Sequence, residues 1–315
     1  MRIAILTSGG DAPGMNATVL NLVKYAIKQN HIPFLVFKGF YGLVNDDMIE
    51  MNLESLNWDY LNQQGSFIYS SRYPDFKNKY TLAIDNLRNR QIDYVIVIGG
   101  NGSYLGAKLL ADNGIKTVFI PSTIDNDVEF TERTIGFSSC EQEVVDNVLK
   151  LQKTFETHNN ICFVEVMGRY CSDLTIAAGL VTHPTLCITH QNKLSIEDAV
   201  KTIYKKYADT AYAIVLVTEH LYDDFEKNSI MESLKLNCGC DVRWNILGYV
   251  QRGANPDWFD VYLAHKMSEV AINSINQDKQ NVAIVYKNSN VMSLNFEELE
   301  SLEKFSLKDL ELINE

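Results

Sequence analysis

Two glycine-rich turns, each directly after a short apolar run, most strongly restrict the fold of this chain. The first turn, SGGD at 8–11, follows the apolar run at 2–7, and the second, GGNGS at 99–103, follows the run at 93–98. After each turn the spacing of apolar residues changes to the three-and-four pattern of an amphipathic helix. A strand, a glycine turn and a helix in this order are typical of parallel sheets whose strand ends bind anions.

The same alternation continues along the rest of the chain. Runs rich in Val, Ile and Phe predict strands at 2–7, 33–38, 93–98, 117–120, 161–166, 186–189, 213–217 and 282–286. Helical spacing predicts helices around 19–27, 82–90, 103–111, 141–155, 195–208 and 257–275. Nearly continuous apolar strands between helices predict an α/β protein, with two Rossmann-like three-layer α/β/α domains and mostly parallel sheets.

Composition excludes several functional classes. The chain has 315 residues and a formal net charge of −12, which argues against nucleic acid as a partner. No apolar run approaches the ~20 residues that cross a bilayer, so we expect no membrane partner and a cytoplasmic location. The six cysteines include no CxxC pair and are expected to be reduced thiols rather than zinc ligands.

Three further motifs carry candidate chemistry. In PSTIDND at 121–127, Asp125 and Asp127 can divide proton transfer and Mg²⁺ binding, although an Asx-rich turn would have the same composition. In EVMGRY at 165–170, Arg169 follows a strand and suits a transferring phosphoryl group. In GYVQRG at 248–253, Arg252, together with Arg243 upstream, is a candidate phosphate clamp, with surface ion pairing as the alternative.

Taken together, these segments resemble the bacterial-type ATP-dependent 6-phosphofructokinase family from residue 2 to about residue 265. The resemblance rests on TSGGDAPGMN, SSRYP, TIDND, VEVMGRY, TEH and LGYVQRG, in that order and spacing. It implies Mg²⁺-dependent transfer of the γ-phosphoryl group of ATP to the 1-hydroxyl of fructose 6-phosphate, a glycolytic reaction. It also implies a homotetramer, with a large nucleotide-binding domain (1–136 plus 251–300) and a smaller sugar-phosphate-binding domain (137–250 plus 301–315).

The resemblance also implies roles for individual residues. Asp125 would be the general base, with Thr123 beside it, and Arg169 would stabilise the transferred phosphoryl group. Mg²⁺ would be held by Asp127 and Asn101. The nucleotide would contact Gly10, Arg72, Tyr73, Gly100, Asn101, Gly102 and Ser103. The sugar phosphate would contact Thr123, Ile124, Asp125, Asn160, Met167, Gly168, Arg169, Glu219, Arg243, Tyr249, Val250, Gln251 and Arg252.

Several positions depart from the family pattern. Asn101 replaces an aspartate near the metal, Asn160 replaces an arginine that a neighbouring subunit supplies, and Tyr249 replaces a substrate-binding histidine. Ser122 replaces a glycine, whereas pyrophosphate-using relatives tend to carry Lys there and Asp at position 102. Most basic residues of the family's effector site are also replaced, which predicts no effector regulation there. These positions are Leu20, Leu53, Gln152, Ala208 and Thr210, with only Lys24 keeping a charge.

Three interpretations remain open from the sequence. The chain is an active 6-phosphofructokinase, because the predicted base and most phosphate-binding arginines are present. Alternatively, it is a catalytically impaired paralogue that acts as a binding or assembly subunit, including in a hetero-oligomer. In the third interpretation it phosphorylates another ketose phosphate, because the sugar pocket has changed.

Overall fold

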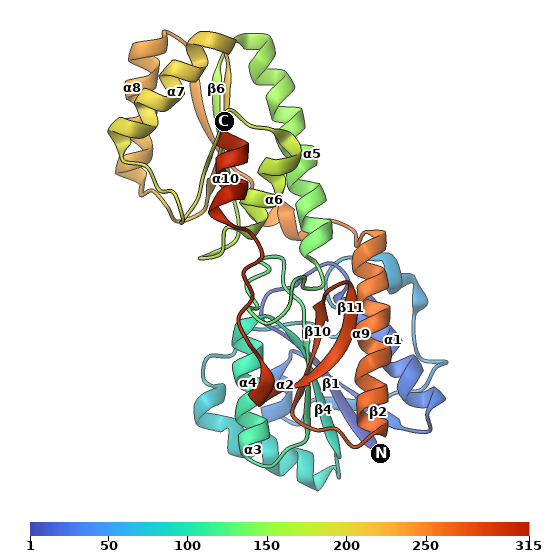
Figure 1. Ribbon diagram of the computed structural model, residues 1–315. Coiled ribbons are helices and arrows are strands. Elements are labelled where there is room, and N and C mark those ends of the chain that lie inside the picture. The colour runs from blue at the N-terminus through green and yellow to red at the C-terminus, as the bar shows by residue number, and fades with distance from the viewer. Residues whose placement is uncertain (315) are drawn as a thin grey trace. The chain divides into compact units, whose positions relative to one another are not determined.

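The computed structural model describes residues 1–314, which form two compact units. Unit 1 comprises Met1–Ile124, Val128–Ser139 and Arg252–Leu302, and unit 2 comprises Asp125–Asp127, Cys140–Gln251 and Glu303–Glu315. Each unit contains its own sheet with helices packed against it (Figure 1). The predicted fold class is confirmed.

Unit 1 has a seven-stranded sheet in the order β11-β10-β5-β4-β1-β2-β3. The two edge strands β3 and β11 are antiparallel to their neighbours, and the other pairs are parallel. The strands are β1 (Arg2–Ser8), β2 (Ile32–Val36), β3 (Met48–Glu50), β4 (Tyr94–Gly99), β5 (Thr117–Pro121), β10 (Val282–Lys287) and β11 (Asn290–Asn295).

The central strand of this sheet marks a change in direction of the chain. From β1 the chain goes to β2 on one side and later returns to β4 on the other side. In the register of the sheet, Ser8 pairs with Gly99 and Gly99 pairs with Pro121, so β1, β4 and β5 end at one level. The carboxyl ends of strands at such a reversal are where open α/β sheets bind ligands.

Helices cover both faces of this sheet. Helices α1 and α9 pack against each other on one face, and α2, α3 and α4 contribute to the apolar core on the other (Figure 1). The helices are α1 (Met15–Lys28), α2 (Phe40–Val44), α3 (Phe76–Asn89), α4 (Asn101–Asp112) and α9 (Trp258–Asn276), with 3-10 turns η1 (Trp58–Asn62) and η3 (Phe296–Glu298).

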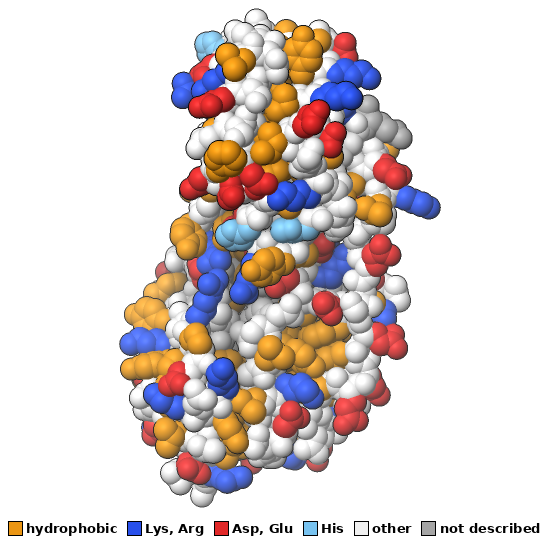
Figure 2. Space-filling view, turned by 90° about the vertical axis from the view of Figure 1, so that its left-hand side faces the viewer, with side chains coloured by type: hydrophobic (Ala, Val, Ile, Leu, Met, Phe, Trp, Pro, Cys, Tyr) orange, Lys and Arg blue, Asp and Glu red, His pale blue; other side chains and the backbone are white. Residues whose placement is uncertain are grey.

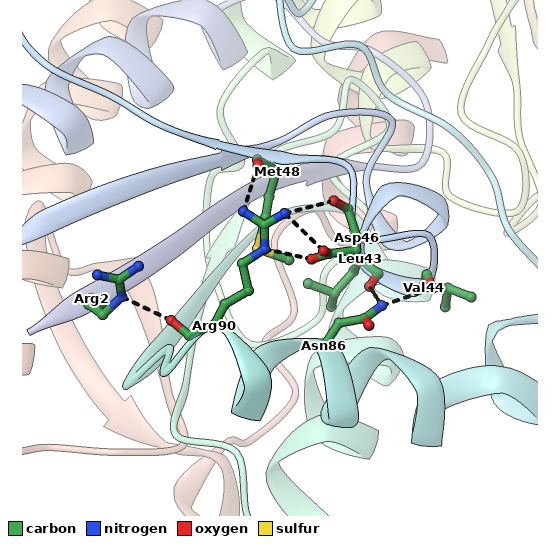
Figure 3. A network of polar contacts seen from close by, with 7 residues as sticks. All are labelled: Arg2, Leu43, Val44, Asp46, Met48, Asn86 and Arg90. Carbon is green, nitrogen blue, oxygen red and sulfur yellow. Dashed lines mark hydrogen bonds and ion pairs between the residues drawn. The ribbon is translucent and has the colours of Figure 1, made fainter.

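An arginine at the end of α3 fastens the α2–β3 segment to the sheet (Figure 3). Arg90 makes two parallel bonds to the carboxylate of Asp46, each 2.8 Å long, and a third bond to the carbonyl of Met48 at 3.3 Å. Its own carbonyl accepts a bond from the Arg2 side chain at 2.9 Å. Because the guanidinium fork matches a carboxylate, this contact fixes direction as well as distance.

Unit 2 has a four-stranded, fully parallel sheet in the order β7-β8-β6-β9. Its strands are β6 (Ile161–Val166), β7 (Leu186–Ile188), β8 (Ala213–Thr218) and β9 (Val242–Ile246). Its helical segments are α5 (Phe137–His158), which begins in unit 1, α6 (Asp173–Thr182), α7 (Ile196–Thr210), α8 (Asp224–Cys238), η2 (Gly248–Arg252) and α10 (Leu307–Asn314). The rings of Phe163 and Trp244 stack 4.6 Å apart in its core.

The structure adds elements that the sequence patterns did not predict. Helices α2, α6, α8 and α10 and strands β3, β9 and β11 were not expected, and α3 begins at Phe76 rather than near residue 82. Across residues 1–314, no helix is both long and apolar enough to span a bilayer. All six cysteines are free thiols.

Candidate active site

The first glycine turn lies at the reversal point of the unit 1 sheet and is tied to the segment at 70–74. The N–H of Gly9 donates to the carbonyl of Ser71 at 3.1 Å, and the Ser70 hydroxyl donates to the carbonyl of Gly9 at 3.0 Å. Gly9 has a φ of +93°, which favours glycine. The structure thereby brings the exposed Arg72 and the half-buried Tyr73 close to this turn.

Arg252 lies over the same turn. A Cβ atom added to Gly10 would lie 3.2 Å from Nη1 of Arg252, so the guanidinium group closes one side of the glycine turn. The Arg252 side chain is 15% exposed and pairs with Asp11 at 3.9 Å. Sequence analysis assigned Arg252 to the sugar phosphate and Gly10 to the nucleotide, and the structure makes them neighbours within unit 1.

The second glycine turn packs directly against the first. The buried Ser103 hydroxyl donates to the carbonyl of Ser8 at 3.0 Å, so it joins the two turns. A Cβ on Gly99 would lie 2.4 Å from that hydroxyl oxygen, which leaves room only for glycine. Gly102 has no atom within 4 Å of such a Cβ, so the turn is open beside it. The first-turn N–H groups of α4 therefore border open space.

The loop after β5 begins beside the second turn. A Cβ on Gly100 would meet the Cβ of Thr123 at 3.4 Å, an ordinary contact. The carbonyl of Thr123 accepts a bond from the Thr134 hydroxyl at 2.7 Å, and the buried Ser122 hydroxyl donates to the carbonyl of Ile135 at 3.2 Å. The segment at 134–135 thus supports Ser122 and Thr123, which precede the predicted base.

A buried carboxylate anchors that supporting segment. Asp260 of α9 is fully buried and accepts bonds from the N–H of Gly136 and the N–H of Ser139, both at 2.8 Å. It also accepts the Ser139 hydroxyl at 2.5 Å. Burial raises the pKa of Asp260 to about 7, against these hydrogen bonds, which lower it, and nearby Asp257 raises it further.

The segment Asp125–Asp127 belongs to unit 2, although only three residues separate it from the end of β5 in unit 1. Between the two predicted functional carboxylates lies Asn126, which is fully buried and has a φ of +52°. Its side-chain NH₂ donates to Asp173 at 2.9 Å, and its carbonyl accepts a bond from Lys304. Asp125 and Asp127 themselves are partly exposed.

The carboxyl edge of the unit 2 sheet gathers five of the predicted sugar-binding residues. Glu219 at the end of β8 accepts the N–H of Gly168 at 3.2 Å and the N–H of Arg169 at 2.7 Å. The Gln251 side chain accepts the N–H of Met167 at 3.1 Å. Arg169 is exposed and has a φ of +57°, so its guanidinium group projects from a tightly held turn.

Two predicted sugar-binding residues lie at the opposite edge of that sheet. Asn160 precedes β6, whereas Met167 follows it, so the length of the strand, roughly 20 Å, separates them. Arg243 pairs in register with Cys162 and lies near the same amino edge as Asn160. The Asn160 side chain accepts the N–H of Asp241 at 3.0 Å, and Arg243 pairs with Asp241 at 2.7 Å. One unit 2 sheet cannot bring both edges to one ligand.

The remaining predicted residues differ widely in exposure. Tyr249 is 79% exposed and Val250 57% exposed, both in η2, whereas Ile124 is 2% exposed and contributes to the core. Sequence analysis missed several residues that hold the site, namely Thr134, Asp173, Asp260 and Lys304. The Asp257-x-x-Asp260 spacing at the start of α9 is a helix N-cap pattern, which could have drawn attention to Asp260. No local pattern marks Lys304 as a residue that holds the site.

The chemistry of the carboxyl edge of the unit 1 sheet fits an anion. Glycine turns with room for a ligand, an overlying arginine and a helix start all favour phosphate. Within residues 1–314, no group of three or more His, Cys, Asp or Glu side chains could hold a metal ion alone. Mg²⁺ accepts one or two protein ligands when substrate phosphates supply the rest. Acidic and basic side chains are interspersed over the face in Figure 2.

Comparisons with known proteins agree on one family. The phosphofructokinase family matches residues 2–275. An ATP-dependent 6-phosphofructokinase of Haemophilus influenzae is 37% identical over 295 residues, which cover 92% of this chain and 91% of the relative.

Solved structures give the same result. Phosphofructokinase from Saccharomyces cerevisiae is 25% identical, with a TM-score of 0.84, over 99% of this chain. The Pichia pastoris enzyme is 27% identical, with a TM-score of 0.86, over 95% of this chain. The present chain spans 45% and 35% of these two longer chains. A match over residues 2–275, together with the 37% identity, shows that the chain belongs to the phosphofructokinase family.

Proposed function

We propose that this chain is an ATP-dependent 6-phosphofructokinase, which transfers the γ-phosphoryl group of ATP to the 1-hydroxyl of fructose 6-phosphate. The single observation that carries the proposal is the pair of glycine turns at the strand reversal, with Arg252 over Gly10. The 37% identity to a relative named for this activity supports it. A glycolytic role in the cytoplasm is the corresponding cellular proposal.

In this proposal, unit 1 binds the nucleotide. The N–H of Gly10 makes no hydrogen bond within the described part of the chain, and the first turn of α4 has N–H groups without helical acceptors. These N–H groups would donate to phosphate oxygens, while Arg72 and Tyr73 would contact the rest of the nucleotide. Gly102 and Ser122 favour ATP over pyrophosphate by resemblance to the ATP-using branch.

Asp127 and Asn101 would hold Mg²⁺ together with the nucleotide phosphates. The ion neutralises phosphate charge when it is bound. Asn101 can offer only a neutral carbonyl oxygen, so Asp127 supplies the one formal negative charge of this pair. We therefore expect weak binding of Mg²⁺, so that activity saturates at a higher Mg²⁺ concentration than in an Asn101→Asp variant.

Asp125 would accept the proton of the sugar's 1-hydroxyl as that oxygen attacks the γ-phosphorus, with Thr123 beside it. Arg169, exposed at the end of β6, would stabilise the charge on the transferred group. The protein then contributes mainly positioning and neutralisation of charge, as in other phosphoryl transfers.

The sugar phosphate would contact residues from both edges of the unit 2 sheet. Because Asn160 and Arg243 lie at the edge opposite Gly168 and Glu219, a complete sugar site requires a second copy of the chain. This separation supports an oligomer with shared sites, and resemblance to the family makes a homotetramer the proposed assembly.

A coupled assay with Mg-ATP and fructose 6-phosphate tests the function. Turnover is expected in the wild type, and Asp125→Asn should lower kcat by about 10³-fold or more, because general-base catalysis and positioning are both lost. A panel of phosphoryl donors and ketose phosphates in the same assay identifies the preferred substrates. No turnover with any pair would leave a binding or assembly subunit as the better description.

A further inference from the structure

A buried lysine from the C-terminal segment contacts the loop that carries the predicted base. Lys304 donates to the carbonyl of Asn126, and its Nζ lies 3.9 Å from a carboxylate oxygen of Asp173. The side chains of Lys304 and Asp173 are only 8% and 11% exposed. The family match covers residues 2–275, so Lys304 lies outside the matched residues.

The three residues form a closed set of contacts around one peptide. Asn126 donates its side-chain NH₂ to Asp173 at 2.9 Å, through the same oxygen that faces Lys304. Its carbonyl bonds to Lys304, so both ends of Asn126 are held. Asn126 is fully buried in a left-handed conformation, which asparagine tolerates better than most other non-glycine residues.

Because of the position of Asn126 in the chain, these contacts affect the orientation of the two carboxylates beside it. It is the only residue between Asp125 and Asp127, so the orientation of its two peptide groups sets where both neighbouring carboxylates point. A displacement of about 1 Å in a reacting group is enough to lower a rate by two orders of magnitude.

We propose that Lys304 is a positioning residue, which, with Asp173, holds Asn126 and thereby orients the carboxylates of Asp125 and Asp127. This inference rests on the proposed kinase function for its effect on the rate, but the positioning itself can be measured without turnover. The C-terminal segment is then part of the active-site support rather than a passive end of the chain.

The primary experiment replaces Lys304 with methionine, which keeps the length of the side chain and removes its charge and donor. We expect kcat to fall about 10- to 100-fold, with KM values for both substrates within about threefold of wild type. Hydrogen exchange should show faster exchange of the amides at 123–128 in the variant, whether or not the enzyme is active.

Lys206→Met is the matched control. Lys206 donates to the carbonyl of Asn314 and so fastens the same C-terminal segment, but it has no contact with the loop at 125–127. We expect kcat of this variant within about threefold of wild type, and unchanged exchange at 123–128. An equal fall in kcat in both variants would mean that only general docking of the segment matters, and would overturn the proposal.

The double variant Lys304→Met/Asp173→Asn separates positioning from charge balance. Removing Lys304 alone takes away a positive charge next to the buried Asp173, which destabilises the fold, whereas the double variant removes both charges. We expect the double variant to recover thermal stability but not kcat. Recovery of kcat, or wild-type exchange at 123–128 in Lys304→Met, would refute the positioning role. Absence of turnover in the wild type would refute the kinase function, and the exchange data alone would then decide the proposal.

Discussion

The two units place a hydrogen-bonding carboxylate differently relative to their ligand edges. In unit 1, Asp260 is fully buried and accepts N–H groups of Gly136 and Ser139, behind the glycine turns. In unit 2, Glu219 is 18% exposed and accepts N–H groups at the strand end itself.

This difference indicates two modes of recognition. At the unit 1 edge the N–H of Gly10 makes no hydrogen bond within the described residues, because Asp260 accepts from Gly136 and Ser139 rather than from the glycine turn. At the unit 2 edge, the N–H groups of Gly168 and Arg169 are already satisfied, so a ligand there must be held mainly by side chains. The same type of strand-end turn therefore leaves a backbone donor open in unit 1 and holds exposed side chains in place in unit 2.

The largest expected effect concerns the charge of Asp260. Its pKa is raised to about 7 from 3.8, so the folded chain holds this proton more tightly than the unfolded chain. Its stabilising contribution is therefore complete below about pH 4 and is lost as the pH rises to about 7. We expect the unfolding free energy of wild type, relative to Asp260→Asn, to fall by about 4 kcal/mol over that range. Urea unfolding at several pH values measures this difference, and a pH-independent difference would refute it.

The next prediction compares one glycine from each edge. Gly168 has a φ of +145°, and a Cβ there would lie 2.3 Å from the carbonyl of Cys171. We expect Gly168→Ala to lower the unfolding free energy by about 3 kcal/mol, from backbone strain and overlap. Gly100→Ala, with its ordinary 3.4 Å contact, should cost less than about 1 kcal/mol and instead weaken nucleotide binding. Equal losses of stability in the two variants would contradict a difference between the tightly packed turn at Gly168 and the open turn at Gly100.

A third prediction restores a cation at the amino edge of unit 2. Asn160→Arg should tighten binding of fructose 6-phosphate about 10-fold, because it adds a charge-assisted hydrogen bond to phosphate. It also removes the acceptor for the N–H of Asp241, so a stability loss of about 1 kcal/mol is expected. Asn160→Ala is the control, with the same loss of stability and no gain in affinity. Calorimetric titration measures both, and unchanged affinity in the arginine variant would contradict a shared sugar site.

The smallest effect is expected away from both edges. Arg90→Lys keeps the charge but cannot make the paired bonds to Asp46, and both side chains are more than one-third exposed. We expect a loss of about 0.5 kcal/mol, reduced further by salt, and no change in kcat. Thermal unfolding at low and high salt tests this, and a change in kcat would show that the α2–β3 segment influences the site.

Local sequence patterns predicted the strands that carry the site but not every element. Strands β1, β4 and β5 are continuous apolar runs, each followed by a glycine turn or by the TIDND loop. The positions of their carboxyl ends could therefore be predicted from the sequence. Helix α6 was missed because nearly all its residues are buried, which leaves no amphipathic stripe. Helix α8 begins with a complete capping box from Asp223 to Glu226, a signal that was present but not used.

The contacts that support the site could not be predicted from local sequence patterns, because the residues that make them are far apart in the chain. Lys304 and Asn126 are 178 residues apart, and no periodicity or spacing encodes such a contact. Asp260 and Gly136 are likewise 124 residues apart. The residues that face a ligand lie in compact motifs, whereas those that hold them come from distant segments whose meeting depends on the whole fold.

The division of unit 1 into separate chain segments has a consequence for synthesis on the ribosome. Residues 140–251 supply nearly all of unit 2 as one stretch, so its sheet can form while the rest of the chain is still being made. Unit 1 must wait, because β10 pairs with β5 and is translated more than 150 residues later. The unit whose first segment emerges earliest is therefore completed last, and until β10 is made β5 has an unpaired edge.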